Sequence, residues 1–262
     1  MEVGSLPVPY RSSVPNLSDA VEGADIVIHV ASVTTPAIAE QNPNLDLENI
    51  RLTLSLIDAC LKKNVRQLIF ASSGGTIYGD ISEPVDELWR PNPKCIYAIG
   101  KLACENYLRQ LSLHTPLQVT VLRISNLFGG LQVTKGGQGV VSHFVHSISQ
   151  QKTVEILGNT IRDYVYIDDV VKAFQRVIEK PEKYQIYNIG TGKGTSLTEL
   201  LDVVVSLLGK TVSKRIGERR PWDLPYNVLK IDKARQQLKW EPTISLYEGI
   251  SRYIASSKKA SS

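Results

Sequence analysis

The stretch Gln67-Leu68-Ile69-Phe70-Ala71-Ser72-Ser73 is a short apolar run that ends in two hydroxyl side chains. A run of this length and composition predicts a strand that is buried on both faces of a parallel sheet. Two similar runs flank it, Asp25 to Ser32 before and Leu117 to Arg123 after. We therefore expect three buried strands that lie side by side.

The segments between these runs have helical spacing. Apolar residues recur three and four positions apart from Asn49 to Lys63, and the basic residues at the end suit a helix C-terminus. A second helix is predicted from Tyr97 to Ser112, after Pro91 and Pro93. The resulting β-α-β-α-β order predicts an α/β fold with a doubly wound parallel sheet. Its ligands would bind at the carboxyl ends of the strands.

The pattern changes beyond about Gly129, where the elements become shorter and richer in glycine and proline. We predict a first domain over residues 1–129 and a smaller lobe over residues 130–262 that faces the crevice of the sheet. Two segments near residues 165–190 have the pattern of elements that return to the main sheet. They are Val165 to Glu179 and Tyr184 to Ile189.

Composition excludes several classes of partner. The 262 residues, 42% of them hydrophobic, suffice for one large domain with an appended lobe. The net charge of +4 is small and the basic residues are scattered, which disfavours nucleic acid and leaves room for an anionic small molecule. No apolar run approaches the ~18 residues of a membrane span, and the first residues lack a secretion pattern. We expect a cytoplasmic protein without a nucleic-acid or membrane partner.

The cysteines and histidines show no metal-binding spacing, so we predict no metal site. The three cysteines are expected to be reduced thiols that pack in the interior, and one histidine lies in a predicted strand and is expected in the core. The residues concerned are Cys60, Cys95, Cys104, His29, His114, His143 and His146.

Tyr97 and Lys101 lie one helical turn apart, on the same face of the second predicted helix. A free tyrosine has a pKa of about 10, and lowering it to ~7 requires roughly 4 kcal/mol of selective stabilisation of the phenolate. A neighbouring ammonium and a positively charged ligand beside it could jointly supply this stabilisation and would make Tyr97 a base near neutral pH. A Tyr-x-x-x-Lys pair also arises by chance in a chain with 11 tyrosines. Its place between the strand that ends at Ser73 and the stretch Arg123 to Asn126 favours the catalytic interpretation.

Further motifs accompany this pair in a definite order. In chain order they are Val27-Ile28-His29-Val30-Ala31, Phe70-Ala71-Ser72-Ser73 with Tyr78-Gly79, Tyr97-x-x-x-Lys101, Leu122-Arg123-Ile124-Ser125-Asn126, Arg162-Asp163-Tyr164-Val165-Tyr166-Ile167-Asp168-Asp169, Tyr187-Asn188-Ile189-Gly190 and Arg219-Arg220-Pro221-Trp222-Asp223-Leu224. Through them the chain, from about Leu17 onward, resembles the extended short-chain dehydrogenase/reductases. Within that group it is similar to the NAD-dependent epimerase/dehydratase family of the UDP-glucose 4-epimerase type. The resemblance implies a Rossmann-type sheet with a C-terminal substrate-binding lobe.

The resemblance also implies a mechanism. Tyr97 takes the proton from the 4-hydroxyl of a UDP-sugar while a hydride passes to NAD, and the 4-keto sugar turns over and receives both back on its other face. Ser73 hydrogen-bonds the reacting oxygen. The loop after Ser73 is one residue longer than the commonest family pattern, so Thr76 is an alternative source of this hydroxyl. Lys101 also binds the ribose of the nicotinamide.

The loop itself favours one reaction of the family. Related dehydratases and decarboxylases carry an acidic residue there, whereas Gly74 and Gly75 have no proton to donate. Epimerisation is therefore favoured over 4,6-dehydration. A 4-keto reductase of the same scaffold stays an alternative.

The remaining site residues follow from the resemblance as well. Besides Tyr97 and Lys101, the positions expected to approach NAD are Ala31, Ser32, Asn49 and Ser72. Two of these, the alanine and its neighbouring serine, could instead be small because elements pack there. Besides Ser73, the positions expected to bind the nucleotide sugar are Asn126, Arg162, Arg220 and Asp223. Arginine suits a diphosphate because its planar fork binds oxygens in pairs.

Alternatives stay open for the arginines and for the outer positions. Arg162 and Arg220 could pair with surface carboxylates, and for Arg219 such a pair is the favoured interpretation. Asn227 either gates N-acetylated sugars or lies in a surface loop. The resemblance implies a homodimer that forms through the Tyr97 helix. The residues that would form its contacts could equally belong to the core. These contacts are Leu102, Tyr107 and Leu108.

The chain departs from the family at its start. Family members begin with a strand, a Gly-x-x-Gly-x-x-Gly loop and a second strand with an acidic end, and two β-α units of about 30 residues each are missing here. We expect either an incomplete sequence of an ordinary epimerase or a real truncation that borrows a partner's half or only binds its ligand. In each case affinity for NAD is expected to be reduced.

Overall fold

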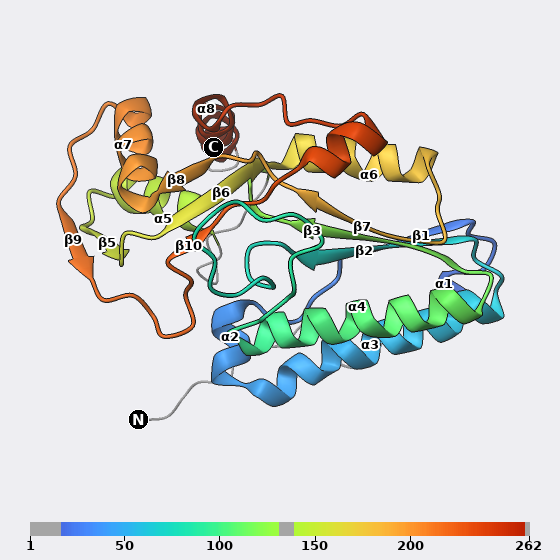
Figure 1. The fold of residues 1–262 in the computed structure, drawn as a ribbon. Helices are drawn as coiled ribbons and strands as arrows, with labels where there is room; N and C mark the ends of the chain where they lie inside the picture. The colour runs from blue at the N-terminus through green and yellow to red at the C-terminus, as the bar shows by residue number, and fades with distance from the viewer. Residues whose placement is uncertain (1–16, 131–138, 260–262) are drawn as a thin grey trace.

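The computed structural model describes residues 17–130 and 139–259 (Figure 1). Residues 1–16, at the start of the predicted first domain, lie outside these ranges. The main sheet has four parallel strands in the order β1 (Ile26–His29), β2 (Gln67–Ser73), β3 (Gln118–Ile124) and β7 (Tyr184–Ile189). The predicted α/β class with a parallel sheet is confirmed. Two of the strands, β2 and β7, have the predicted limits.

Helices cover both faces of this sheet (Figure 1). On one face α3 (Pro43–Lys62) and α4 (Ile96–His114) pack on Leu68 and Phe70 of β2. On the other face α6 (Ile167–Glu179) and the π-helix η1 (Ala234–Leu238) pack on Ile69. Neighbouring strand residues point to opposite faces. The uninterrupted apolar run of β2 therefore contacts the helices on both faces of the sheet.

Helix α3 begins six residues before the predicted start at Asn49. Asn42 caps it, its side chain accepting from the N–H of Leu45 at 3.2 Å, and Pro43 occupies the first turn. This Asn-Pro pair is a common start signal, because proline needs no donor there. The extra turns carry Asp46, which is buried.

The first strand departs from the prediction. Only Ile26–His29 is extended, and Ile28 and Val30 are 44% and 61% exposed, so the expected burial on both faces was wrong. Within the described residues β1 pairs with β2 along one edge and with no strand along the other. An edge position leaves these side chains without a covering layer.

A second region follows β3. Its largest sheet has β6 between β4 and β10, with β8 antiparallel to β6, and a separate pair joins β5 to β9. Three helices pack in a separate apolar cluster on these strands (Figure 1). The strands are β4 (Asn126–Phe128), β5 (Val154–Leu157), β6 (Ile161–Tyr166), β8 (Gly194–Ser196), β9 (Lys214–Gly217) and β10 (Tyr226–Asn227), and the helices are α5 (Val140–Ser149), α7 (Leu197–Leu208) and α8 (Leu246–Lys259). Two short helices, α1 (Leu17–Ala20) and α2 (Pro36–Gln41), flank β1.

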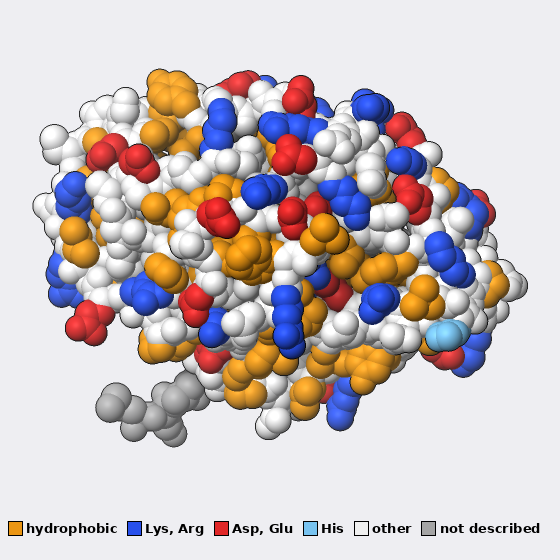
Figure 2. Space-filling model, in the orientation of Figure 1, with side chains coloured by type: hydrophobic (Ala, Val, Ile, Leu, Met, Phe, Trp, Pro, Cys, Tyr) orange, Lys and Arg blue, Asp and Glu red, His pale blue; other side chains and the backbone are white. Residues whose placement is uncertain are grey.

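The segments near residues 165–190 contact the main sheet, since β7 pairs with β3 and α6 packs on it. The division of the chain at residue 129 stays a prediction. Figure 2 shows basic and acidic side chains interspersed on the visible face, without a block of one sign. Among the described residues, no helix combines the length and apolar character that crossing a bilayer requires.

Candidate active site

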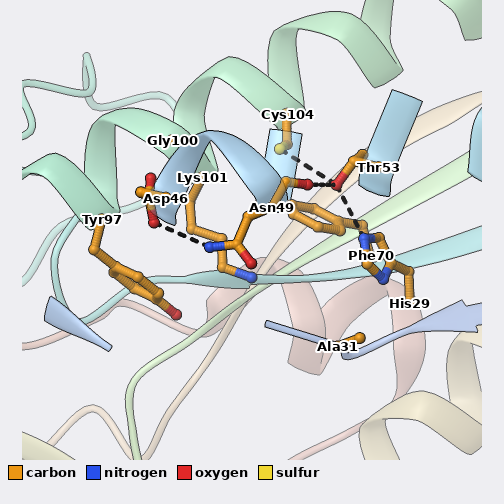
Figure 3. A pocket seen from close by; sticks show the side chains of 10 residues that line it. All are labelled: His29, Ala31, Asp46, Asn49, Thr53, Phe70, Tyr97, Gly100, Lys101 and Cys104. Carbon is orange, nitrogen blue, oxygen red and sulfur yellow. Dashed lines mark hydrogen bonds between the residues drawn. The ribbon is translucent and has the colours of Figure 1, made fainter. Parts of the chain in front are cut away.

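Tyr97 and Lys101 project from the first turns of α4 into one pocket (Figure 3). Lys101 is 6% exposed, and its ammonium donates to the backbone oxygen of Ala71 at 3.0 Å. The same nitrogen lies 4.8 Å from the centre of the Phe70 ring and 5.7 Å from that of Tyr97. The end of β2 therefore holds the ammonium beside the phenol.

Burial dominates the electrostatics of the pair in the chain alone. Burial of the Tyr97 ring, followed by the carboxylate of Asp46 and the thiol of Cys95, raises the pKa of the phenol to about 12. Burial also lowers the pKa of Lys101. The predicted lowering of the Tyr97 pKa requires a second positive charge beside Lys101 and stays a prediction.

The two candidate hydroxyls lie together at the end of β2, Ser73 as its last residue and Thr76 in the loop that follows. The hydroxyl of Thr76 donates to that of Ser73 at 2.9 Å, and both residues are half-buried. The loop between them is fixed, since the N–H of Gly74 donates to the backbone oxygen of Ile124 at 2.8 Å. The fold therefore brings the two alternatives to one place.

Gly74 and Gly75 have little room for side chains. A Cβ at Gly74 would lie 2.6 Å from Leu229 Cδ1 and 2.7 Å from the backbone oxygen of Arg123. At Gly75 it would lie 3.2 Å from Asn126 Oδ1. Packing thus disfavours an acidic side chain in this loop, in addition to the sequence having none.

The loop after β1 reaches the same pocket. Ala31 and Asn49 line it together with Tyr97 and Lys101 (Figure 3). The side-chain oxygen of Asn49 accepts from the N–H of Val33 at 2.8 Å and so fixes the loop. Ala31 and Ser32 are exposed, so packing does not explain their size. The Ser32 hydroxyl donates to the backbone oxygen of Thr34 at 3.0 Å.

Ser72 does not direct its side chain to this pocket. Its buried hydroxyl donates to Glu105 Oε1 at 2.5 Å, in a network that joins α4 to the sheet. Glu105 also pairs with Arg123 at 2.7 Å, and Arg123 donates to the Tyr78 hydroxyl at 3.0 Å. The predicted cofactor contact of the Ser72 side chain is therefore not supported. The sequence reasoning missed Glu105, although it lies one turn beyond Lys101 on the same helix.

The predicted substrate residues come from three segments. Asn126 begins β4, and its buried Oδ1 has no hydrogen-bond partner among the described residues. Arg162 of β6 is half-buried and Arg220 is exposed. Neither forms a salt bridge within the described part of the chain, so the alternative of surface ion pairs is not supported there. Arg220 and Asp223 lie together in one turn, because the N–H of Asp223 donates to the backbone oxygen of Arg220 at 3.1 Å.

The surroundings of Arg219 and Asn227 differ from those that the sequence predicted. Arg219 donates to the backbone oxygen of Asp223 at 2.6 Å and not to a carboxylate, so the surface ion pair was wrong. Asn227 is fully buried in β10, and its amide donates to the Gly74 oxygen at 3.1 Å. The surface-loop interpretation of Asn227 was therefore wrong as well.

The proposed dimer contacts divide between core and surface. Leu108 is fully buried and Leu102 is partly buried against the core, whereas Tyr107 is 48% exposed. Packing accounts for the two leucines. Of the three, Tyr107 is the one that a partner could reach.

The cysteines are free and buried, as predicted: Cys60, Cys95 and Cys104. His29 is also buried, hydrogen-bonded through Nε2 to the Thr53 hydroxyl at 3.0 Å. In residues 17–130 and 139–259, no three or more His, Cys, Asp or Glu side chains gather closely enough to hold a metal ion.

Comparisons with known proteins agree with this arrangement. Residues 10–190 match the NAD dependent epimerase/dehydratase family. The chain is 34% identical over 234 residues to a putative UDP-glucose 4-epimerase of Methanocaldococcus jannaschii, covering 88% of this chain and 76% of that protein. It is also 34% identical over 235 residues to a dTDP-4-dehydro-6-deoxyglucose reductase of Escherichia coli, covering 88% and 74%.

Solved structures give the same result. The UDP-glucose 4-epimerase of Thermotoga maritima, solved with UDP-glucose, matches with a TM-score of 0.90 and 31% identity over 94% of this chain and 82% of that one. The Thermus thermophilus UDP-glucose 4-epimerase, solved with NAD, matches with a TM-score of 0.88 and 32% identity over 93% and 81%. The sequence match, the parallel sheet and the paired Tyr97 and Lys101 together show that this chain belongs to the NAD-dependent epimerase/dehydratase family.

Proposed function

We propose that the protein is an NAD-dependent epimerase that inverts C4 of a UDP-hexose. The observation that carries the proposal is the shared pocket of Tyr97 and Lys101, beside the loop after β1. Lys101 is bonded to the backbone of Ala71 in β2, and this strand ends in a hydroxyl-bearing loop without an acid. The similarity to UDP-glucose 4-epimerases of known structure supports it.

The residues present fit the nicotinamide-riboside end of NAD. Lys101 would bind the ribose hydroxyls, and Ala31 and Asn49 border the space beside it (Figure 3). Within the described residues, the sheet has no strand and glycine-rich loop on the outer side of β1 to hold the pyrophosphate. When bound, NAD would supply the redox chemistry, as the reversible acceptor of the hydride at the sugar carbon.

The chain's own residues would move the proton. The Tyr97 phenolate removes the proton of the sugar 4-hydroxyl, and Ser73 or Thr76 donates a hydrogen bond to the oxygen that becomes the ketone. After the sugar turns over, Tyr97 returns the same proton to that oxygen, so the reaction consumes none. Because the pKa of the phenol is about 12 in the chain alone, Lys101 needs the added positive charge of the oxidised nicotinamide to make Tyr97 a base at neutral pH.

The diphosphate would lie between β4 and the Arg219–Asp223 turn. Arg162 and Arg220 supply guanidinium groups without intramolecular ion pairs in the described part, and such groups bind phosphate oxygens in pairs. Asn126 directs an unpartnered oxygen toward Gly75, and the carboxylate of Asp223 would accept from a ribose hydroxyl. Asn227 is fully buried and joins β10 to the hydroxyl-bearing loop, so we propose that it influences the choice of sugar only through the position of that loop.

A second candidate is a 4-keto sugar reductase. The observation in its favour is the E. coli reductase, which is as similar to this chain as the putative epimerase from M. jannaschii. A reductase oxidises one reduced nicotinamide for each sugar, whereas an epimerase has no net redox change.

The experiment that tests the proposal is incubation of the protein and NAD with UDP-glucose, UDP-GlcNAc and UDP-glucuronic acid in turn, with NMR detection of the C4 epimers. Epimer formation that is lost in Tyr97→Phe supports the proposal. A 6-deoxy-4-keto product, or reduction of a 4-keto sugar with matched cofactor oxidation, contradicts it. Binding of UDP-sugar without any turnover would identify a non-catalytic binding module.

We further propose that the protein acts in the cytoplasm as a homodimer. The buried free thiols suit a reducing compartment. Tyr107 lies on the exposed side of α4, where a second copy could pack. Sedimentation analysis of the wild-type protein and of Tyr107→Glu tests the dimer.

A further inference from the structure

Asp46 is a buried carboxylate in the active-site pocket that the proposed chemistry does not use. It lies in the first turn of α3, is 4% exposed, and borders the pocket between Tyr97 and Gly100 (Figure 3). It forms no salt bridge among the described residues. A buried carboxylate is costly unless its oxygens have donors, so its partners indicate why it is there.

One carboxylate oxygen holds the loop that follows β1. Asp46 Oδ1 accepts from the Thr34 hydroxyl at 2.5 Å and from the side-chain amide of Asn49 at 3.0 Å. The same amide lies 2.7 Å from the Thr34 hydroxyl, and the Asn49 oxygen accepts from the N–H of Val33 at 2.8 Å. Three of these hydrogen bonds tie the loop to the start of α3, and the bond between Asn49 and Asp46 lies within the helix.

The other carboxylate oxygen packs against α4. A Cβ placed on Gly100 would collide with Asp46 Oδ2 and would lie 3.2 Å from its Cγ. Glycine weakens a helix interior, yet it stands here between Tyr97 and Lys101. The close approach of the carboxylate accounts for the glycine, because no other residue leaves room for it.

We propose that Asp46 is a positioning residue, which joins the loop after β1 to the face of α4 that carries Tyr97 and Lys101 through a contact that only Gly100 permits. Its effect on rate rests on the proposed function, whereas the contact itself does not. The loop and the catalytic helix would shift relative to each other if either half of the link were lost.

The charge of Asp46 has a second consequence. The titratable groups around the phenol are Asp46 from α3, His29 from β1, Glu40 from α2, and Cys95, Lys101 and Cys104 from α4 and its N-cap. Burial raises the pKa of the Cys95 and Cys104 thiols. Burial, and to a smaller extent the charge of Lys101, lowers the pKa of His29 to about 4. All three groups are therefore neutral at pH 7. The carboxylate of Asp46 raises the pKa of Tyr97, after burial itself. Asp46 therefore opposes formation of the phenolate that the reaction needs.

The contact is tested by a double-mutant cycle of Gly100→Ala and Asp46→Ala, read by thermal unfolding. Alone, Gly100→Ala should lower the Tm by about 3–10 °C, because overpacking outweighs the gain in helix propensity. In the Asp46→Ala background the same substitution should be neutral or raise the Tm. An equal loss in both backgrounds would overturn the proposal, and this readout needs no enzymatic activity.

The charge is tested by Asp46→Asn, which keeps the size and the acceptor oxygen. The acid limb of the pH profile of C4 epimerisation should move down by about one pH unit, with KM for the sugar nearly unchanged. The matched control is Asp58→Asn, which removes the same charge from the same helix at an exposed ion pair with Lys62 and should leave the profile in place. An unmoved acid limb in Asp46→Asn contradicts this part. If the wild type has no turnover, the proposed function fails, while the unfolding cycle still decides the contact.

Discussion

Glu105 and Arg123 form an ion pair of 2.7 Å in which the side chains are only 2% and 4% exposed. The pair joins α4, the helix that carries Tyr97 and Lys101, to the inner strand β3. Glu105 also accepts from Ser72 of β2, so one carboxylate links three elements. Removing one member of a buried pair leaves the other charge without a partner.

Glu105→Ala should therefore lower the free energy of unfolding by about 3–5 kcal/mol. Urea denaturation followed by circular dichroism measures this loss. Glu48→Ala removes the acidic member of an exposed pair with Arg51 and should change the stability by less than about 1 kcal/mol. Similar losses of unfolding free energy in the two variants would show that the buried pair contributes no more to stability than the exposed pair.

Tyr97→Phe should reduce the rate of epimerisation by roughly 10²–10⁴-fold, because it removes the group that takes and returns the proton. The fold should be unaffected, since the Tyr97 hydroxyl forms no hydrogen bond with another described residue. Tyr247→Phe, at an exposed tyrosine of α8, is the control and should retain full activity. Full turnover in Tyr97→Phe would contradict the assigned role.

The two glycines after Ser73 should differ in their tolerance of alanine. Gly74→Ala should cost about 1–3 kcal/mol of stability, because its Cβ would meet the Arg123 backbone at 2.7 Å and backbone cannot move aside. Gly75→Ala meets the Asn126 side chain at 3.2 Å and should cost less. Thermal unfolding of both variants checks the order, which would be wrong if Gly75→Ala were the more harmful.

Stability should fall in mild acid because of His29. Burial, and then the charge of Lys101, lowers the pKa of His29 in the folded state to about 4, against about 6.5 when unfolded. Between these values the unfolded chain binds the extra proton, so stability is lost as the pH falls through this window, by up to ~3 kcal/mol. Unfolding at pH 7 and pH 4.5 should show a smaller loss for His29→Gln than for the wild type. His114→Gln, at an exposed site, should behave as the wild type does.

Much of the main sheet could be predicted, because its strands are apolar runs whose burial does not depend on distant residues. The limits of β2 and β7 are examples. The start of α3 was missed because Leu45 and Leu47, two positions apart, lack helical spacing, although the Asn42-Pro43 pair was a usable signal. The exposure of Ile28 was missed because the pattern of a strand does not tell whether a layer covers it.

The site was predictable to a lesser degree. Side chains at consecutive strand positions point to opposite faces, so Ser72 and Ser73 could not both face the crevice, and this rule would have directed Ser72 toward α4. The raised pKa of Tyr97 depends on burial and on Asp46, whose approach to Gly100 is set by the packing of two helices. No spacing along the chain contains that information.

The uncovered side of β1 bears on how the protein behaves in concentrated solution. Within the described residues no strand pairs with this edge, so its backbone donors and acceptors, next to the apolar groups of Ile28 and Val30, offer a template onto which another chain can add as a strand. Charged side chains or proline usually prevent such growth, and neither occurs within Ile26–His29. Precipitation during purification should therefore start at this edge, and a lysine at position 28 should delay it.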